Sequence, residues 1–140
     1  MKHLIRFSDI SINDAHAIFR LADEFRAGKH RNCLKDHTVA LFFPESSIRT
    51  RVTYERGIYL MGGQNVLFPP SALDKKEDVG DVVAYLSNWV SGIVVRHTDI
   101  SLLDKMAEHS DIPIINAMTD VNHPCEMLSD VYALSKIFPD

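Results

Sequence analysis

The sequence predicts an α/β domain of three layers, α-β-α, in which a four-stranded parallel sheet has helices on both faces. Short apolar runs without polar alternation are typical of parallel strands that are covered on both faces, and the clearest is Thr38–Phe43. Longer segments with apolar residues at helical spacing separate these runs. Strands that alternate with helices favour a parallel sheet with right-handed crossovers.

The first half of the chain begins with an expected helix that ends near Gly28. Ser11 followed three residues later by Asp14 resembles a capping box for its start. Its apolar stripe consists of Ala15, Ile18, Phe19, Ala22 and Phe25. After the strand at Thr38–Phe43, a loop leads to a second helix, which Gly62-Gly63 is expected to end because glycine tolerates the left-handed conformation. The apolar residues of that helix are Val52, Ile58 and Met61.

The second half repeats the alternation three times. Strands are expected at residues 66–68, 93–95 and 113–115, and a loop at 69–78 follows the first of them. The first intervening helix has an apolar face of Val79, Val82, Val83, Leu86 and Val90. The second, shorter helix carries Leu102, Leu103, Met106 and Ala107. Pro124 opens a last helix with Leu128, Val131 and Leu134.

Composition narrows the class of protein. The chain has 140 residues, of which 46% are hydrophobic and 24% charged, as expected for one soluble domain spanning 1–140. A net charge of -4 provides no general attraction for nucleic acid, so nucleic acid is not an expected partner. The two cysteines lack paired metal spacing, and there is no signal peptide or long apolar run. We therefore expect a cytoplasmic protein with no bound metal and no membrane partner.

Cationic or polar residues follow every expected strand. They are Ser46–Arg51 after the first, Lys75 and Lys76 after the second, Arg96 and His97 after the third, and Asn122 and His123 after the fourth. Ligands of such sheets bind beyond the carboxyl ends of the strands. The sequence therefore predicts an anion site at that edge.

The segment Ser47–Arg51 carries the strongest argument for an anion. Ser47 is expected to cap the helix, while the free N–H groups of Ile48, Arg49 and Thr50 point at the anion. The Arg49 guanidinium suits bidentate phosphate binding, and Thr50 adds a hydroxyl. An ordinary capped helix with solvated arginines fits the local motif equally well.

Two motifs carry a family resemblance. Ser47–Arg51, read as Ser-Ile-Arg-Thr-Arg, resembles the Ser-Thr-Arg-Thr-Arg phosphate motif of carbamoyltransferases, and His123–Glu126, read as His-Pro-Cys-Glu, resembles their His-Pro-Cys-Gln segment. Gly62-Gly63, residues 81–86 and residues 94–96 fall between them in the family's order, so the resemblance covers nearly the whole chain. The His-Pro-Cys form looks like the ornithine branch. Arg96-His97 and the loop bearing Lys75 look like the aspartate branch.

The resemblance implies transfer of the carbamoyl group of carbamoyl phosphate to an amine, with ornithine the favoured acceptor and aspartate or putrescine next. It assigns catalysis to Arg96, His123 and Thr50. It assigns contacts with carbamoyl phosphate to Ser47, Ile48, Arg49, Thr50, Arg96, His123 and Glu126, with Lys75 supplied by a neighbouring subunit. It implies a homotrimer that needs no cofactor. The amine would bind a C-terminal amino-acid-binding domain, which we expect to be absent from this chain, so that the isolated domain is inactive.

Two departures from the family motifs leave alternatives open. Ile48 replaces a threonine, which removes a hydroxyl but keeps the backbone N–H. Glu126 replaces a glutamine, which puts an ionisable acceptor beside a dianionic substrate. This second change supports a rival function, a non-catalytic anion-binding or subunit-interaction paralogue. Another rival is a flavodoxin-like signalling or nucleotide domain, but the glycine-rich dinucleotide signature is missing after the first strand. Lys75 and Lys76 also fit a solvated charge run on a mobile loop.

Overall fold

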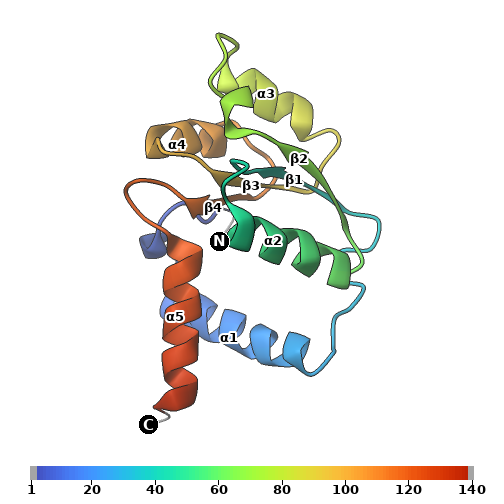
Figure 1. Ribbon diagram of the computed structural model, residues 1–140, viewed down its shortest axis with the longest axis vertical. Helices are drawn as coiled ribbons and strands as arrows, with labels where there is room; N and C mark the ends of the chain where they lie inside the picture. Colours follow the sequence, from blue (N-terminus) through green and yellow to red (C-terminus); the bar gives the residue numbers. More distant parts are fainter. Residues whose placement is uncertain (1–2, 139–140) are drawn as a thin grey trace.

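The computed structural model describes residues 3–138, which form four parallel strands and five α-helices (Figure 1). The helices are α1 (Ile12–Arg26), α2 (Ile48–Leu60), α3 (Val79–Leu86), α4 (Ile100–Glu108) and α5 (Pro124–Ile137). The strands are β1 (Thr38–Phe42), β2 (Gln64–Phe68), β3 (Gly92–Arg96) and β4 (Ile114–Met118). Short 3-10 helices lie at η1 (Phe7–Asp9) and η2 (Pro70–Ala72). No helix within this range is both long and apolar enough to cross a membrane.

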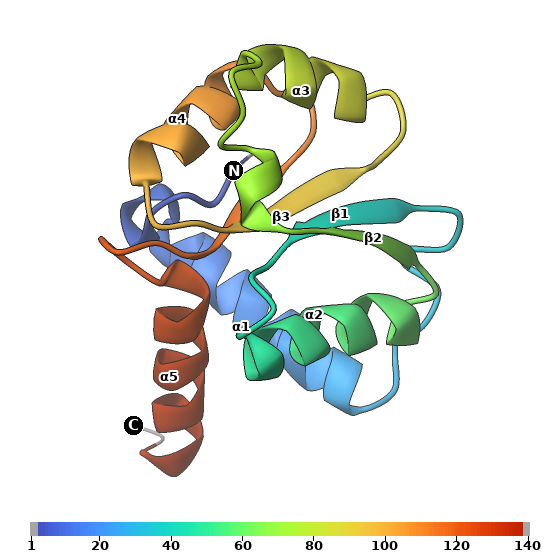
Figure 2. The ribbon, with the colours of Figure 1, turned by 45° about the horizontal axis from the view of Figure 1, so that its top comes forward.

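The strand order is β2-β1-β3-β4, with every neighbouring pair parallel. Helices cover both faces of the sheet: α3 and α4 lie on one side, and α1 and α2 on the other (Figure 2). The three-layer α/β class predicted from the sequence is therefore confirmed. Because all strands run the same way, the loops before α2, α3, α4 and α5 leave the sheet at one edge.

Alternate residues of the strands supply two separate cores. On β1, Ala40 and Phe42 enter the core beneath α3 and α4, whereas Leu41 enters the core beneath α2, together with Phe43 just after the strand. The central strands are buried on both faces, which is why their sequences read as unbroken apolar runs. This burial holds the carboxyl ends of β1 and β3 rigidly side by side.

The expected boundaries shift most at the edge strands. β2 begins at Gln64, two residues before the apolar run, and its outer position in the sheet permits polar side chains there. β4 extends to Met118 because buried Asn116 continues the strand. The capping box at Ser11 and Asp14 is present, and Gly62 has the positive φ expected of a helix-ending glycine. Helix α3 is shorter than expected: it ends at Leu86, whereas the apolar pattern extended to Val90.

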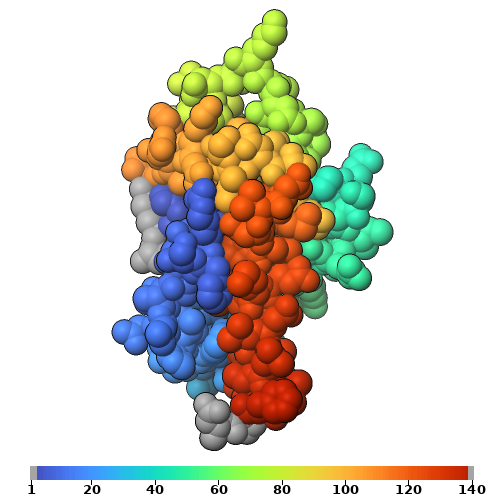
Figure 3. All heavy atoms as spheres, turned by 90° about the vertical axis from the view of Figure 1, so that its left-hand side faces the viewer, coloured from blue at the N-terminus to red at the C-terminus, as the bar shows by residue number. Residues whose placement is uncertain are grey.

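Helices α1 and α5 lie side by side, as the blue and red segments of Figure 3 show. The Tyr132 hydroxyl donates to Asp23 at 2.7 Å, and Lys136 forms an ion pair with the same carboxylate at 2.7 Å. The rings of Phe19 and Tyr132 pack with centroids 5.5 Å apart. These contacts fix the direction of α5, and with it the position of the residues at its start.

Candidate anion site at the carboxyl edge of the sheet

A hydrogen bond joins the end of β3 to the start of α2, the helix that follows β1. Arg96, the last residue of β3, donates from Nη1 to the Oγ of Ser47, at the start of α2, over 2.8 Å. The two residues are 49 positions apart in sequence. The fold therefore brings together a guanidinium and a helix N-terminus, which are two kinds of anion-binding group.

The predicted role of Ser47 as a side-chain cap is wrong. Its hydroxyl makes no capping hydrogen bond to α2, and it is buried where it accepts from Arg96. The Ile48 N–H is also not free, because it donates to the Ser46 carbonyl at 3.0 Å. The side chain of Ile48 is 71% exposed and does not line the Ser47–Arg96 contact.

Arg49 and Thr50 keep unused donors at the first turn of α2. In the described part of the chain, their N–H groups have no backbone acceptor, as expected for the start of a helix. The guanidinium of Arg51 is already held by Glu55, with Nε 2.6 Å from Oε1. Arg49 is exposed and forms no ion pair within residues 3–138, so its guanidinium is available to a ligand.

His123 and Glu126 lie together at the start of α5. Their Nε2 and Oε2 atoms are 3.1 Å apart, and the imidazole is 19% exposed whereas the carboxylate is 65% exposed. Burial lowers the pKa of His123; Glu126 opposes this shift and the positive charge of Arg96 reinforces it. His123 is therefore neutral at pH 7, and the carboxylate beside Nε2 favours the tautomer in which Nε2–H donates to Glu126. The other ring nitrogen, Nδ1, is buried without a partner in the described residues.

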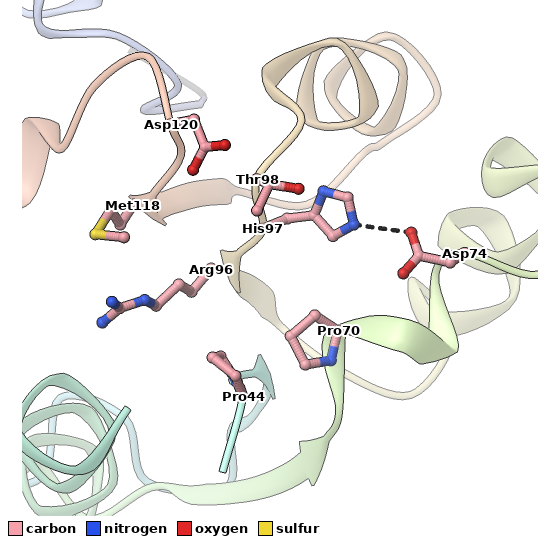
Figure 4. Close-up of a pocket in the computed structure, with 8 residues that line it drawn as sticks. All are labelled: Pro44, Pro70, Asp74, Arg96, His97, Thr98, Met118 and Asp120. Atoms are coloured by element: carbon pink, nitrogen blue, oxygen red, sulfur yellow. Dashed lines mark hydrogen bonds and ion pairs between the residues drawn. The ribbon is translucent and has the colours of Figure 1, made fainter. Parts of the chain in front are cut away.

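A pocket of about 330 Å³ opens beside Arg96 (Figure 4). It is lined by Pro44, Pro70, Asp74, Arg96, His97, Thr98, Met118 and Asp120. His97 is fixed in this pocket from both ring nitrogens. Nε2 lies 2.9 Å from the Asp74 carboxylate, and Nδ1 accepts from the Asp99 N–H at 3.0 Å. The imidazole thus ties the loop after β2 to the loop after β3.

Asn116 is a site-building residue that the sequence patterns did not identify. It is fully buried in β4, and its Nδ2 donates to the Ile5 carbonyl at 2.8 Å and to Asn122 Oδ1 at 2.7 Å. The second bond fixes the residue immediately before His123. A single amide in the otherwise apolar strand Ile114–Met118 was the available signal, because a buried amide needs partners.

Lys75 is not brought to the Ser47–Arg96 pair within one chain. It is exposed on the loop after β2 and makes no hydrogen bond or ion pair with residues 3–138. In the sequence Lys75 comes directly after Asp74, whose carboxylate is bound to His97. The loop is therefore anchored next to Lys75, while the lysine side chain itself extends into solvent.

Cys125 is a packing residue in this structure. It accepts from the Tyr54 hydroxyl at 3.1 Å and contacts the Asn116 carbonyl at 3.4 Å. Burial raises the pKa of the Cys125 thiol, which disfavours the nucleophilic thiolate. The pKa of Tyr54 is raised as well, chiefly by burial.

Cationic groups gather at the carboxyl edge of the parallel sheet, which is the edge where α/β domains of this kind bind their ligands. A family model described as the aspartate/ornithine carbamoyltransferase carbamoyl-P binding domain matches residues 2–136. The chain belongs to this family and corresponds to its carbamoyl-phosphate-binding domain. The resemblance seen in the sequence is confirmed.

Individual relatives agree with the family assignment. The ornithine carbamoyltransferase of Aquifex aeolicus is 37% identical over 130 residues, covering 90% of this chain and 42% of the relative. That of Chlorobaculum tepidum is 37% identical over 117 residues, covering 82% of this chain and 33% of the relative. The crystal structure of ornithine carbamoyltransferase from Thermus thermophilus superposes with a TM-score of 0.90 at 30% identity, covering 99% of this chain and 50% of that one. The chain thus spans between a third and a half of the length of these relatives.

Proposed function

We propose that this domain binds carbamoyl phosphate at the carboxyl edge of the sheet and takes part in transferring its carbamoyl group to an amine. The observation that supports the proposal is the hydrogen bond from the Arg96 guanidinium to Ser47, the residue before α2. In the first turn of α2 the N–H groups of Arg49 and Thr50 have no backbone acceptor among the described residues. Arg49 would hold the phosphate through two parallel N–H···O bonds. Ser47 would join the site through its hydroxyl once Arg96 turns toward the ligand.

The reaction is attack of an amine nitrogen on the carbonyl carbon of carbamoyl phosphate. A C–N bond forms, the carbonyl electrons move to oxygen, and collapse of the tetrahedral intermediate breaks the C–O bond to release inorganic phosphate. Thr50, Arg96 and His123 would donate to the developing oxyanion, which needs preorganised donors in a site that excludes water. The neutral state of His123 suits it to donate from Nε2 without repelling the cationic Arg96.

Ornithine is the proposed acceptor, with citrulline as its product, because the relatives quoted above carry the name ornithine carbamoyltransferase. Aspartate and putrescine are the next candidates. The described residues at the sheet edge supply donors for an anion. We propose that the amine is bound by a second domain, as the greater length of the relatives suggests, and that the isolated domain is inactive.

We also propose that the functional unit is a homotrimer in which Lys75 completes the site of a neighbouring subunit. Lys75 extends into solvent from a loop anchored by Asp74 and His97. A lysine in this position is available to contact a neighbouring subunit. Mixing Lys75→Ala subunits with Arg49→Ala subunits in the assembled enzyme should restore some turnover through hybrid sites. Verified mixed trimers with no recovered turnover would exclude a shared site.

Calorimetry of the 140-residue chain tests the carbamoyl phosphate site. A charge-assisted contact contributes about 1.5–3 kcal/mol, so Arg49→Ala should weaken binding by about tenfold or more. The matched control is Arg20→Ala, which removes an exposed arginine from α1. Unchanged binding in the Arg49→Ala protein would remove the phosphate assignment.

A second candidate function is a non-catalytic anion-binding or subunit-interaction paralogue. It is favoured by Glu126, because its carboxylate pairs with the Nε2 of His123. A substrate carbonyl oxygen would need the same Nε2–H. Competition between carbamoyl phosphate and inorganic phosphate separates the two candidates. A carbamoyltransferase site should prefer carbamoyl phosphate, whereas a generic anion site should bind both equally.

A further inference from the structure

A second cavity lies at the opposite edge of the sheet. It measures about 660 Å³ and is lined by Phe25, Arg26, Gly28, Lys29, Arg31, Arg56, Gly57, Leu60 and Met61. Helix α2 starts at the anion site and ends at this cavity, and its 13 residues span about 20 Å. We call this cavity the α1–α2 pocket. It shares no lining residue with the pocket beside Arg96.

The α1–α2 pocket carries a concentrated positive charge in a protein whose net charge is -4. Its four cationic residues are Arg26, Lys29, Arg31 and Arg56, and no aspartate or glutamate lines it. Within residues 3–138 none of the four forms an ion pair. The neighbouring carboxylates of α1 and α2 are bound to other groups, in the pairs Asp23–Lys136, Glu24–His30 and Glu55–Arg51. Arg26 and Lys29 act on two of these carboxylates only at longer range.

The helix ends at the pocket do not balance this charge. The C-termini of α1 and α2 each carry the equivalent of about -0.5 elementary charge. Together they offset about one of the four positive charges. The guanidinium of Arg31 folds over Gly28, where an added Cβ would meet its Nη2 at 3.4 Å. Arg56 lies over the Tyr59 ring, 5.0 Å from the centroid.

The rest of the pocket wall is apolar and open. Phe25 is 37% exposed and Leu60 is 53% exposed, and Met61 lies beside them at the end of α2. The volume falls in the range of about 300–1,000 Å³ that is typical of small-molecule pockets. Apolar surface beside uncompensated cations matches a ligand that has an apolar group and a negative charge.

We infer that the α1–α2 pocket is a binding site for a small organic anion that carries two or more negative charges on an apolar group. The apolar group covers Phe25 and Leu60, and the charged group lies between Arg31 and Arg56. The site is independent of the carbamoyl phosphate proposal, because its residues and its edge of the sheet are different. A ligand there occupies the far end of the helix whose first turn contains Arg49.

Titration of the 15N-labelled 140-residue chain with 1-naphthyl phosphate tests this site. We expect the amide signals of Gly28 and Gly57 to shift with saturable binding. Removing Arg31 and Arg56 together by Arg31→Ala and Arg56→Ala should weaken this binding by at least about tenfold, since both contacts are charge-assisted. The control variant Arg20→Ala should bind like the parent. Arg49→Ala should also leave the Gly28 and Gly57 shifts unchanged, even if it abolishes binding of the same probe at the carboxyl edge of the sheet.

Two further probes separate the parts of the ligand. Uncharged 1-naphthol and ring-free pyrophosphate should each bind the pocket at least about tenfold more weakly than 1-naphthyl phosphate, because each lacks one of the two interactions. Absence of shifts at Gly28 and Gly57 would overturn the inference. Equal binding of either simpler probe, or equal loss in the Arg20→Ala control, would overturn it as well.

Discussion

Replacing Glu126 by glutamine is expected to tighten carbamoyl phosphate binding. The substitution keeps the size of the side chain and removes the charge that holds the Nε2 of His123 at 3.1 Å. In the parent, a carbonyl oxygen must compete with the Glu126 carboxylate for the Nε2–H. The dianionic phosphate must also approach that carboxylate. Both costs fall when the side chain becomes a neutral amide.

The size of the effect follows from exposure. The Glu126 carboxylate is 65% exposed, so solvent screens its pair with His123. Such exposed pairs contribute about 0.2–1 kcal/mol, which converts to about 1.4-fold to fivefold in the dissociation constant. Calorimetric titration with freshly prepared carbamoyl phosphate measures this directly.

Glu108→Gln is the matched control for this experiment. It changes the net charge equally, but Glu108 is exposed at the end of α4, at the opposite edge of the sheet. If Glu126→Gln bound carbamoyl phosphate more weakly than the parent while Glu108→Gln did not, Glu126 would be a positive determinant of binding. That result would show that Glu126 does not compete with the carbonyl oxygen for the Nε2–H of His123.

Three further predictions concern stability and the loop after β2. Because the folded-state pKa of His123 lies below its ordinary value of 6.5, the unfolded chain takes up the proton first, and stability falls as pH drops below that value. His123→Gln should therefore flatten the decline in unfolding free energy from about pH 7 to about pH 5, by at most about 1.4 kcal/mol per pH unit; an unchanged slope contradicts this. Releasing Asp74 by His97→Ala should speed trypsin cleavage after Lys75, and an unchanged rate would mean that the 2.9 Å contact does not restrain the loop. Asp78→Ala should lower the unfolding free energy by about 1 kcal/mol, because Asp78 caps α3 by accepting from the Gly80 N–H, whereas Asp78→Asn should be nearly neutral in a denaturant titration.

The sequence predicted the fold class because local patterns and burial agree. The apolar run at Thr38–Phe43 becomes a strand buried on both faces, and each loop after a strand leaves the sheet at the same edge. The capping box at Ser11 could be predicted because both partners lie within one helical turn. Edge strands were predicted less well, because the outer strand β2 begins with polar residues that no apolar pattern marks.

The site was predicted in part, and its failures have a common cause. The residue types at the sheet edge were recognisable, but their pairings depend on contacts between distant segments. Ser47 was expected to cap its own helix, yet its hydroxyl accepts from Arg96, 49 residues away. The ties made by His97 and Asn116 likewise join loops or strands whose proximity follows only from the strand order.

The pairing of Glu126 was also beyond the sequence patterns. Charge alone does not determine which group meets the Glu126 carboxylate. In the structure Arg51 binds Glu55 and Arg96 binds Ser47, which leaves His123 as the partner of Glu126. Which of several nearby cations meets a carboxylate depends on side-chain geometry that spacing along the chain does not encode.

Titration of the 15N-labelled 140-residue chain with carbamoyl phosphate locates the binding site for this ligand. We predict saturable shifts of the backbone amides of Arg49 and Thr50 and of the Arg96 guanidinium, with the Gly57 amide at the far end of α2 unaffected. Arg96→Ala should abolish the shifts of the Arg49 and Thr50 amides at the same ligand concentration. Saturable binding that leaves Arg49, Thr50 and Arg96 unperturbed, or the absence of any binding, would contradict the assignment of a carbamoyl phosphate site to this edge of the sheet.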